Sequence, residues 1–318
     1  MANLFDMRFI VNTGKGGVGK TTLSVAMAQA FARRGKRVLI MQMNVPDKLG
    51  PLYGRAPIHG DVPVLLDRNI WVVNPTPQEA MREYALMILR FRTLYKAAFE
   101  NRLVSRFLRM MPGLPELVML GKAYYHEKEL EGSKPRWDVV ILDAPATGHG
   151  MFLLQIPQVI TESIAGGLMA DEARKMGALL RDKTRTMLNI ITLAEELPIN
   201  ESVELKARLD RDVGIQVGYV VANHIYPRVF NDAEGRQLQT LLDEEGGGRT
   251  GLGAMLAAGV FRYRRRALQD HYLARARKEL ALPVVEAPFI FEAELKPEHI
   301  VTIADALTRA VQAKGAAR

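Results

Sequence analysis

The sequence of 318 residues contains no cysteine. This absence excludes disulfides, thiolate zinc sites, iron–sulfur clusters and a cysteine nucleophile. The chain also has no apolar run near the roughly 20 residues that a membrane-spanning helix needs. Residues 1–12 show no basic n-region and no cleavage site, so we expect no secretion signal. These absences favour a cytoplasmic protein, and the net charge of +8 leaves peripheral association with an anionic membrane surface open.

Apolar segments alternate with helical patterns along the chain, which is typical of a parallel sheet with helices on both sides. The predicted strands lie at 8–12, 37–42, 70–73, 138–143, 218–223 and 282–287. We therefore predict an α/β fold, a single domain over 1–318 with a mainly parallel twisted sheet flanked by helices. Long helical stretches at about 76–132 and 151–212 do not fit the alternation. We interpret them as two insertions that form a helical subdomain.

The segment GKGGVGKT (14–21) matches the pattern G-x-x-x-x-G-K-[ST] between a strand pattern and a helix pattern. Glycines let backbone N–H groups close around phosphate oxygens, and the following helix N-terminus adds its dipole. We expect Lys20 to reach the β- and γ-phosphates of ATP and the Thr21 hydroxyl to bind Mg²⁺. The predicted nucleotide-binding residues of this loop are Gly14, Lys15, Gly16, Gly17, Val18, Gly19, Lys20, Thr21 and Thr22.

Lys15 is a second lysine in a loop that already has Lys20 for its own phosphates. A cation at the mouth of the loop is best used across a symmetric interface, against the phosphates of a facing subunit, as an arginine finger supplied in trans is used. Lys15 and Lys20 are therefore candidate catalytic residues. The alternative is that Lys15 neutralises phosphate from its own side.

The segment GKGGVGKTT resembles the deviant phosphate-binding loop of a superfamily of dimeric ATPases. Its members include the nitrogenase iron protein, the Min- and Par-type positioning ATPases, and the arsenical-pump and tail-anchored-protein-targeting ATPases. The segment VVILDAPATGHG resembles the D-T-A-P-T-G-H signature of the last branch. The matching positions are Asp143, Thr147, Gly148 and His149, whereas Ala144 replaces a threonine and the proline is displaced to Pro145. This resemblance implies that Asp143 holds Mg²⁺ or its water, together with Thr21.

Three weaker matches agree with that branch. PGLPE (112–116) resembles part of its helical subdomain, and VVANHIYP resembles a strand whose terminal asparagine, here Asn223, contacts adenine. EAPFIF resembles the final loop on the nucleotide side, around Pro288 and Phe289. The 143–149 signature and the helical insertions argue against a Par- or Min-type positioning ATPase, which remains an alternative.

One departure from the family concerns hydrolysis. In the family the second strand ends in D-P-A-H, and its aspartate positions the attacking water. Here the chain reads MQMNVPDKLG, and Met43 takes the aspartate position in the simplest alignment. Because methionine cannot accept a proton or orient water, slow hydrolysis follows. A slip in register leaves Asp47 as the alternative catalytic carboxylate.

The segments RFLRMMPGLPELVMLGK (106–122) and MLNIITLAEELPINESVE (187–204) most resemble a bacterial subgroup without cysteine in which two related chains pair. This resemblance implies a homodimer or a heterodimer with a paralogous ATPase, because the arsenical efflux enzyme carries two halves in one chain and this sequence has one. The missing cysteines exclude the family's thiolate arsenite site and its zinc clip. Two functions stay open: an ATPase that couples its nucleotide state to a protein or anion client, and a weakly hydrolysing partner subunit.

Two further patterns allow two interpretations each. Methionines in the helical regions favour either an apolar groove for a hydrophobic or membrane-protein client, or interior packing. They are Met81, Met87, Met110, Met111, Met119, Met151, Met169, Met176 and Met187. The basic run 261–280 suits anionic lipid or nucleic acid, but a solvated helix is the simpler interpretation. We expect no nucleic-acid partner.

Overall fold

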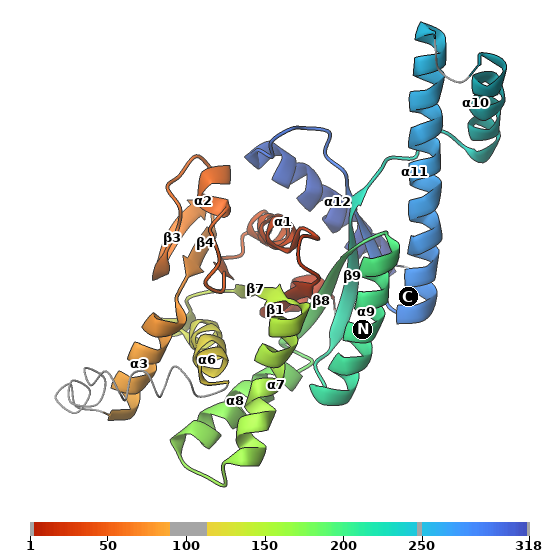
Figure 1. Cartoon of the computed structure of the whole chain (residues 1–318). Helices are drawn as coiled ribbons and strands as arrows, with labels where there is room; N and C mark the ends of the chain where they lie inside the picture. The colour runs from red at the N-terminus through yellow and green to blue at the C-terminus, as the bar shows by residue number, and fades with distance from the viewer. Residues whose placement is uncertain (1–2, 90–112, 247–249, 317–318) are drawn as a thin grey trace.

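A computed structural model describes residues 3–89, 113–246 and 250–316. Within these residues the chain forms an eight-stranded sheet with the order β10-β9-β8-β1-β7-β2-β4-β3 (Figure 1). The strands are β1 (Phe9–Gly14), β2 (Val38–Met41), β3 (Gly60–Asp67), β4 (Ile70–Asn74), β7 (Val139–Ala146), β8 (Thr186–Leu193), β9 (Val217–Ile225) and β10 (Val284–Pro288). All neighbouring pairs are parallel except β3 with β4. The predicted α/β class with a mainly parallel sheet is confirmed.

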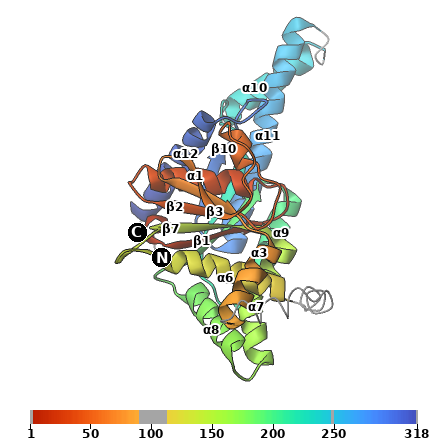
Figure 2. The same cartoon turned by 90° about the vertical axis from the view of Figure 1, so that its left-hand side faces the viewer.

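Helices cover both faces of this sheet. The α-helices of the described residues are α1 (Lys20–Ala32), α2 (Leu49–Leu52), α3 (Pro77–Leu89), α6 (Leu114–Lys128), α7 (Thr147–Ser163), α8 (Leu168–Arg181), α9 (Glu196–Asp212), α10 (Asp232–Glu244), α11 (Gly251–Leu280) and α12 (Pro297–Ala316). Figure 2 shows α1 and α12 on one face and α6, α7 and α8 on the other. A short 3₁₀ helix (Leu4–Asp6) precedes β1, and β5 (Leu130–Glu131) pairs with β6 (Lys134–Pro135) in a separate hairpin.

Side chains of each central strand alternate between two hydrophobic cores. In β1, Phe9 and Val11 join the core under α6 to α9, whereas Ile10 joins the core under α1 and α12. In β2, Leu39 and Ile40 divide in the same way. Burial on both faces explains why these strands read as continuous apolar runs rather than as polar–apolar alternation. The carboxyl ends of these parallel strands meet at one edge, where loops can form a site.

The expected insertion over 151–212 is wrong in its second half. It contains β8, which pairs in parallel with β1 in the middle of the sheet. The segment TMLNIITL is a short apolar run, and periodicity alone does not separate a buried strand from a buried helix. Only α7 and α8 form a helical excursion here. The expected insertion over 76–132 contains α3 and α6, and its residues 90–112 lie outside the described residues.

Most of the methionines highlighted by the sequence pack in the interior. Met81, Met119, Met151, Met176 and Met187 are buried, and Met169 packs against the same core from a partly buried position. The interior-packing interpretation is confirmed for these residues. Met110, Met111 and the side chain of Met87 lie outside the described part of the chain.

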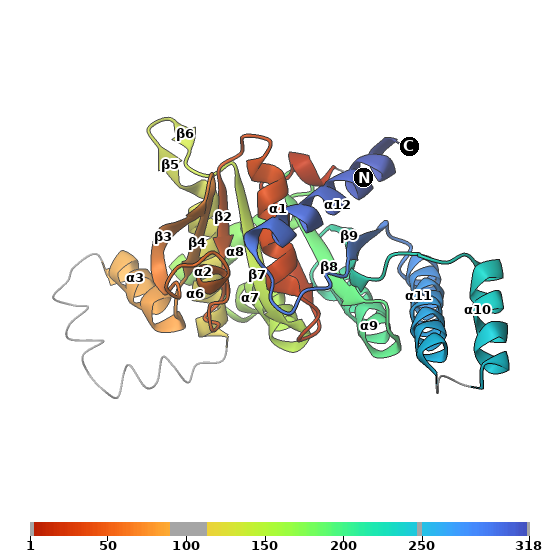
Figure 3. The ribbon, with the colours of Figure 1, turned by 90° about the horizontal axis from the view of Figure 1, so that it is seen from above.

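The basic run belongs to α11, a helix of 30 residues. Figures 1 and 3 show its first half extending beyond the sheet, with α10 packed alongside it. Several of its arginines bond other side chains: Arg264 with Gln239, Arg265 with Glu195, Arg275 with Glu279, and Arg277 with Glu286. Much of the positive charge is therefore balanced within the chain. In the described residues, no helix is both long and apolar enough to cross a membrane.

Candidate nucleotide-binding site

The phosphate-binding loop lies between β1 and α1, as the sequence predicts. Gly17 and Gly19 have φ angles of +86° and +89°, which L side chains rarely adopt. A Cβ on Gly19 would lie 2.2 Å from Nδ2 of Asn223, whereas one on Gly17 would meet nothing within 4 Å. Gly19 therefore allows the loop to lie against β9, and Gly17 faces open space.

Lys20 folds over its own loop. Its Nζ donates to the backbone oxygens of Gly14, at 3.2 Å, and Lys15, at 3.0 Å. Burial lowers the pKa of Lys20, while the nearby carboxylate of Asp143 acts in the opposite direction. The ammonium group thus lies over the loop that the motif predicts to bind phosphate, and its contact with the phosphates stays a prediction.

Asp143 lies near the end of β7 and faces the first turn of α1. Its Oδ2 accepts a 2.6 Å hydrogen bond from the hydroxyl of Thr21, and its Oδ1 accepts one of 3.2 Å from Ser24. Burial raises the pKa of the Asp143 carboxyl, against these hydrogen bonds and the charge of Lys20, which favour its ionised form. A hydroxyl and a buried carboxylate are the hard oxygen ligands that Mg²⁺ prefers, so these two residues fit the ion.

Sequence reasoning missed the support behind this carboxylate. Ser24 also accepts a 3.0 Å hydrogen bond from Asn12 of β1, and Asn189 of β8 donates to Asn12 at 3.1 Å. Ser24 could have been found, because residues three apart share one face of a helix. Asn189 could not, because its strand was not recognised.

The adenine-side residues gather at the carboxyl ends of β9 and β10. Asn223 is buried, and its Nδ2 donates to the backbone oxygen of Val18 at 3.0 Å, so it supports the phosphate loop directly. Pro288 pairs with Ile225, and the ring of Phe289 stacks on Tyr226 at a centroid distance of 4.7 Å. The structure thus places these predicted residues near one end of the sheet. Contact with adenine stays a prediction.

Lys15 turns away from the cradle that holds Lys20. Its Nζ bonds Oε1 of Glu201 on α9 at 2.6 Å. No sequence pattern pointed to Glu201, which lies 186 positions further along the chain. The two lysines of the loop therefore face different partners.

Comparison with known proteins agrees with this arrangement. The family model described as anion-transporting ATPase matches residues 7–172, just over half of the 318 residues. The chain belongs to this family. The match includes the phosphate loop, Asp143 and the start of α7, and it shows an ATPase family whose members use ATP with Mg²⁺.

Individual relatives of this chain are distant, at 25–29% identity for the three that follow. ATPase BagA of Mycobacterium tuberculosis is 25% identical over 231 residues, covering 71% of this chain and 67% of the relative. A putative arsenical pump-driving ATPase 1 of Aquifex aeolicus is 29% identical over 160 residues, covering 48% and 39%. The arsenical pump-driving ATPase of Acidiphilium multivorum is 26% identical over 234 residues, covering 69% and 40%.

The loop after β2 is held by packing and by hydrogen bonds to the backbone. Met43 is buried in the core under α6 and α7. The carboxylate of Asp47 accepts hydrogen bonds from the backbone N–H groups of Leu49 and Gly50, both at 2.9 Å, and Ile58, at 2.8 Å. Asp47 thus bonds the backbone of the first turn of α2 and that of the segment just before β3. Oδ1 accepts one of these bonds and Oδ2 accepts two, and a catalytic role for Asp47 stays a prediction.

A small cavity of about 140 Å³ joins this loop to the other signature segments. Its lining includes Met43 and Asn44 after β2, Glu116 at the start of α6, and His149 at the start of α7.

The hydroxyls of Thr13 and Thr147 are buried without a partner among the described residues. Unpaired buried hydroxyls are costly, so these two are candidates to contact a bound ligand.

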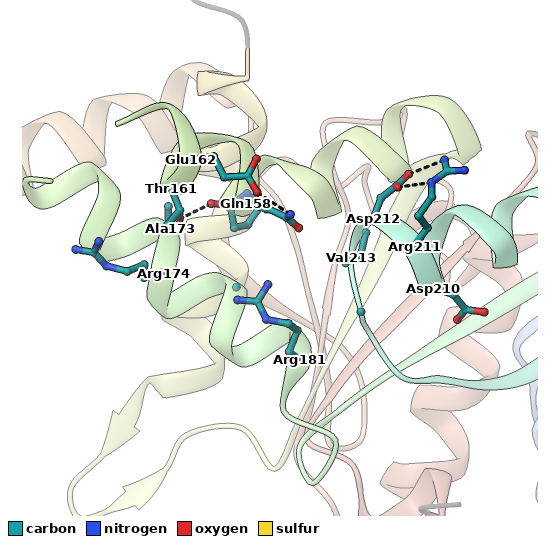
Figure 4. A pocket seen from close by; sticks show the side chains of 13 residues that line it. Gln158, Thr161, Glu162, Ala173, Arg174, Arg181, Asp210, Arg211, Asp212 and Val213 are labelled. Carbon is teal, nitrogen blue, oxygen red and sulfur yellow. Dashed lines mark hydrogen bonds and ion pairs between the residues drawn. The ribbon is translucent and has the colours of Figure 1, made fainter. Parts of the chain in front are cut away.

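A second cleft, of about 400 Å³, lies away from the phosphate loop between α7, α8 and the end of α9 (Figure 4). Two of its charged side chains pair with each other, and several of its polar groups form local hydrogen bonds. Arg211 bonds Asp212 at 2.7 Å, Gln158 bonds Glu162 at 2.8 Å, and the hydroxyl of Thr161 donates to the backbone of Pro157. This cleft contains no predicted site residue, and we assign it no part in nucleotide binding.

Proposed function

We propose that this chain is a nucleotide-driven switch that closes on a second subunit when ATP is bound and hydrolyses ATP slowly. Closure would couple the nucleotide state to a conformational change for a protein or anion client. The second subunit is another copy of the chain or a paralogous ATPase. The observation that carries this proposal is the separation of Lys15 from Lys20.

Lys20 lies inside its own cradle, whereas Lys15 reaches outward to Glu201 at 2.6 Å. One ammonium group and a helix N-terminus already face the phosphates of this site. Lys15 is therefore best placed to meet the phosphates of a facing subunit, where it would stabilise the charge that develops during phosphoryl transfer.

The residues divide the work of the reaction as follows. Backbone N–H groups of the loop and Lys20 hold the triphosphate, and Thr21 with Asp143 would hold Mg²⁺. Mg²⁺, when bound, supplies positive charge that neutralises the β- and γ-phosphate oxygens. Water attacks the γ-phosphorus, the bond to the leaving β-phosphate oxygen breaks, and the protons of the water pass to the released phosphate and to solvent. No carboxylate at position 43 orients that water, which supports slow turnover.

The client is the least determined part of the proposal. Val159 on α7 and Leu168 on α8 are large apolar side chains that stay exposed. They support a hydrophobic or membrane-protein client on this side of the molecule.

The buried position of Met43 favours one second candidate, a nucleotide-binding partner subunit that hydrolyses little ATP itself. It would complete a composite site with a paralogous ATPase. The two candidates differ in what the purified chain does alone.

ATP should change the mass of the purified chain in solution, and turnover should be read in the same tube. With ATP and Mg²⁺ we expect a shift toward twice the mass of one chain, and with ADP a smaller shift, because ADP lacks the γ-phosphate that would meet Lys15. Light scattering after size exclusion measures the mass with ATP and the mass with ADP. A single-chain mass with ATP, together with undiminished turnover, would exclude a dimeric mechanism. A single-chain mass without turnover would favour the partner-subunit candidate.

Asp47→Asn separates a structural from a catalytic carboxylate. Asn keeps one oxygen and cannot accept all the present backbone hydrogen bonds, so we expect a loss of roughly 1–3 kcal/mol in the free energy of unfolding. Turnover per folded molecule should hold. If Asp47 orients the water, turnover should instead fall by about 10²–10⁴. Met43→Asp places a carboxylate at the position where the family has its aspartate. This variant should raise turnover if the loop accommodates the carboxylate. Chemical unfolding and steady-state phosphate release measure the two effects.

A further inference from the structure

The contact between Lys15 and Glu201 joins the phosphate loop, which follows β1, to α9. The 2.6 Å bond is the one hydrogen bond or ion pair that either side chain makes within the described parts of the chain. Their side chains are 30% and 34% exposed, so both are accessible to solvent and to another subunit. The pair therefore resembles a surface ion pair that can open without disturbing the core.

Glu201 is held in place by the packing of α9. Ile199 and Leu205 on either side of it are buried in different hydrophobic cores. The hydroxyl of Ser202 is buried and donates to the backbone of Pro198 at 2.7 Å. The carboxylate thus projects from a fixed helix toward the loop. Lys15 has the longer and more flexible side chain, so Lys15 is the member of the pair that moves.

The ion pair opposes the trans role of Lys15 in two ways. It occupies the ammonium group with a carboxylate of its own chain, and that carboxylate would repel the triphosphate of a facing subunit. Lys15 must exchange one anionic partner for another when the dimer closes. A ligand shifts an equilibrium only by its difference in affinity for the two states. The bond to Glu201 stabilises the open state, so it reduces the difference in free energy by which ATP favours the closed dimer.

We propose that Glu201 is a positioning residue that retains Lys15 on its own subunit and so sets the ATP level at which the dimer closes. This inference rests on the proposed function, because it requires that Lys15 act in trans. It adds a residue outside the phosphate loop that determines when the trans contact forms. Its effect should disappear when Lys15 is absent.

The test compares Glu201→Gln with Glu204→Gln. Glu204 lies one turn further along α9, is exposed and has no ion pair in the described residues, so it is a matched control. Exposed ion pairs shift equilibria by up to about fivefold. We expect Glu201→Gln to tighten the ATP-dependent dimer about two- to fivefold, measured by sedimentation with ATP and Mg²⁺. Turnover at low protein concentration should rise by a similar factor.

ATP affinity of the single chain should be unchanged in both variants, which separates the proposal from a general effect on the loop. The double variant Lys15→Ala with Glu201→Gln should behave as Lys15→Ala alone. If Lys15→Ala weakens the dimer but Glu201→Gln leaves it unchanged or weakens it, the retention role is wrong and the proposed function stands. If Lys15→Ala has no effect on dimer or turnover, the proposed function itself fails.

Discussion

Replacing Lys20 with alanine is expected to abolish measurable nucleotide binding. In the structure the Lys20 ammonium lies over the loop, bonded to the oxygens of Gly14 and Lys15. A bound triphosphate would replace those two neutral acceptors with charged ones, and hydrogen bonds to charged groups contribute about 1.5–3 kcal/mol each. Loss of two such bonds corresponds to a fall in affinity of about 10²–10⁴.

Calorimetry with ATP and Mg²⁺ measures this loss directly. Lys36→Ala is a suitable control, because Lys36 is an exposed lysine beyond the end of α1. Circular dichroism and the unfolding temperature of both variants should match the wild type, since neither side chain is part of a core. An unchanged dissociation constant for Lys20→Ala would remove the assignment of residues 14–21 as the phosphate cradle.

Lys15→Ala should leave nucleotide binding to the single chain nearly intact while lowering closed-dimer formation and turnover by about 10³ or more. The reason is that Lys15 bonds Glu201 and not its own cradle. Trans-acting cations in phosphoryl transfer contribute about 10³–10⁵ in rate. Without ATP the facing lysines would also repel one another, so the wild-type dimer should require nucleotide.

Mixed dimers identify which subunit Lys15 serves. The test pairs a Lys15→Ala chain with a Lys20→Ala chain. If Lys15 acts in trans, both defects fall on the site of the Lys20→Ala chain. If Lys15 acts in cis, each of the two sites carries one defect. In the trans case the only chain able to bind ATP, the Lys15→Ala chain, faces an intact Lys15, so its site should turn over. A mixed dimer as inactive as Lys15→Ala alone would indicate that Lys15 acts on its own phosphates.

Sequence predicted the parts of this molecule that depend on local pattern. The loop at 14–21 needs only glycines, a lysine and a threonine at fixed spacing, and Asp143 follows a readable strand. The class of fold followed from alternating runs. Strand β8 was missed because TMLNIITL carries no turn signal and has no period that distinguishes a buried strand from a helix.

Long-range partners could not be predicted in the same way. The bond between Lys15 and Glu201 depends on how α9 packs against β1, which no local spacing encodes. The backbone partners of Asp47 could not be predicted from the sequence either. Its position near the expected switch segment suggested catalysis, whereas the structure gives its oxygens three backbone partners. An acidic residue in a loop is equally suited to capping a helix and to chemistry, and only its contacts distinguish the two.

The long helix α11 has a mechanical consequence for the molecule. Its inner half is anchored by Leu273, Ala276 and Leu280, and Arg266 bonds both the backbone of Tyr226 and the carboxylate of Glu286. The anchor thus touches the segment after β9 that carries the aromatic ring stacked on Phe289. Its outer half runs from Arg266 back to Gly251, 15 steps of about 1.5 Å each, and forms a lever of about 22 Å. A tilt of about 10° at the anchor would therefore move the far end of the helix by about 4 Å. A small change at the carboxyl ends of β9 and β10 would thus become a displacement large enough for a neighbouring protein to detect.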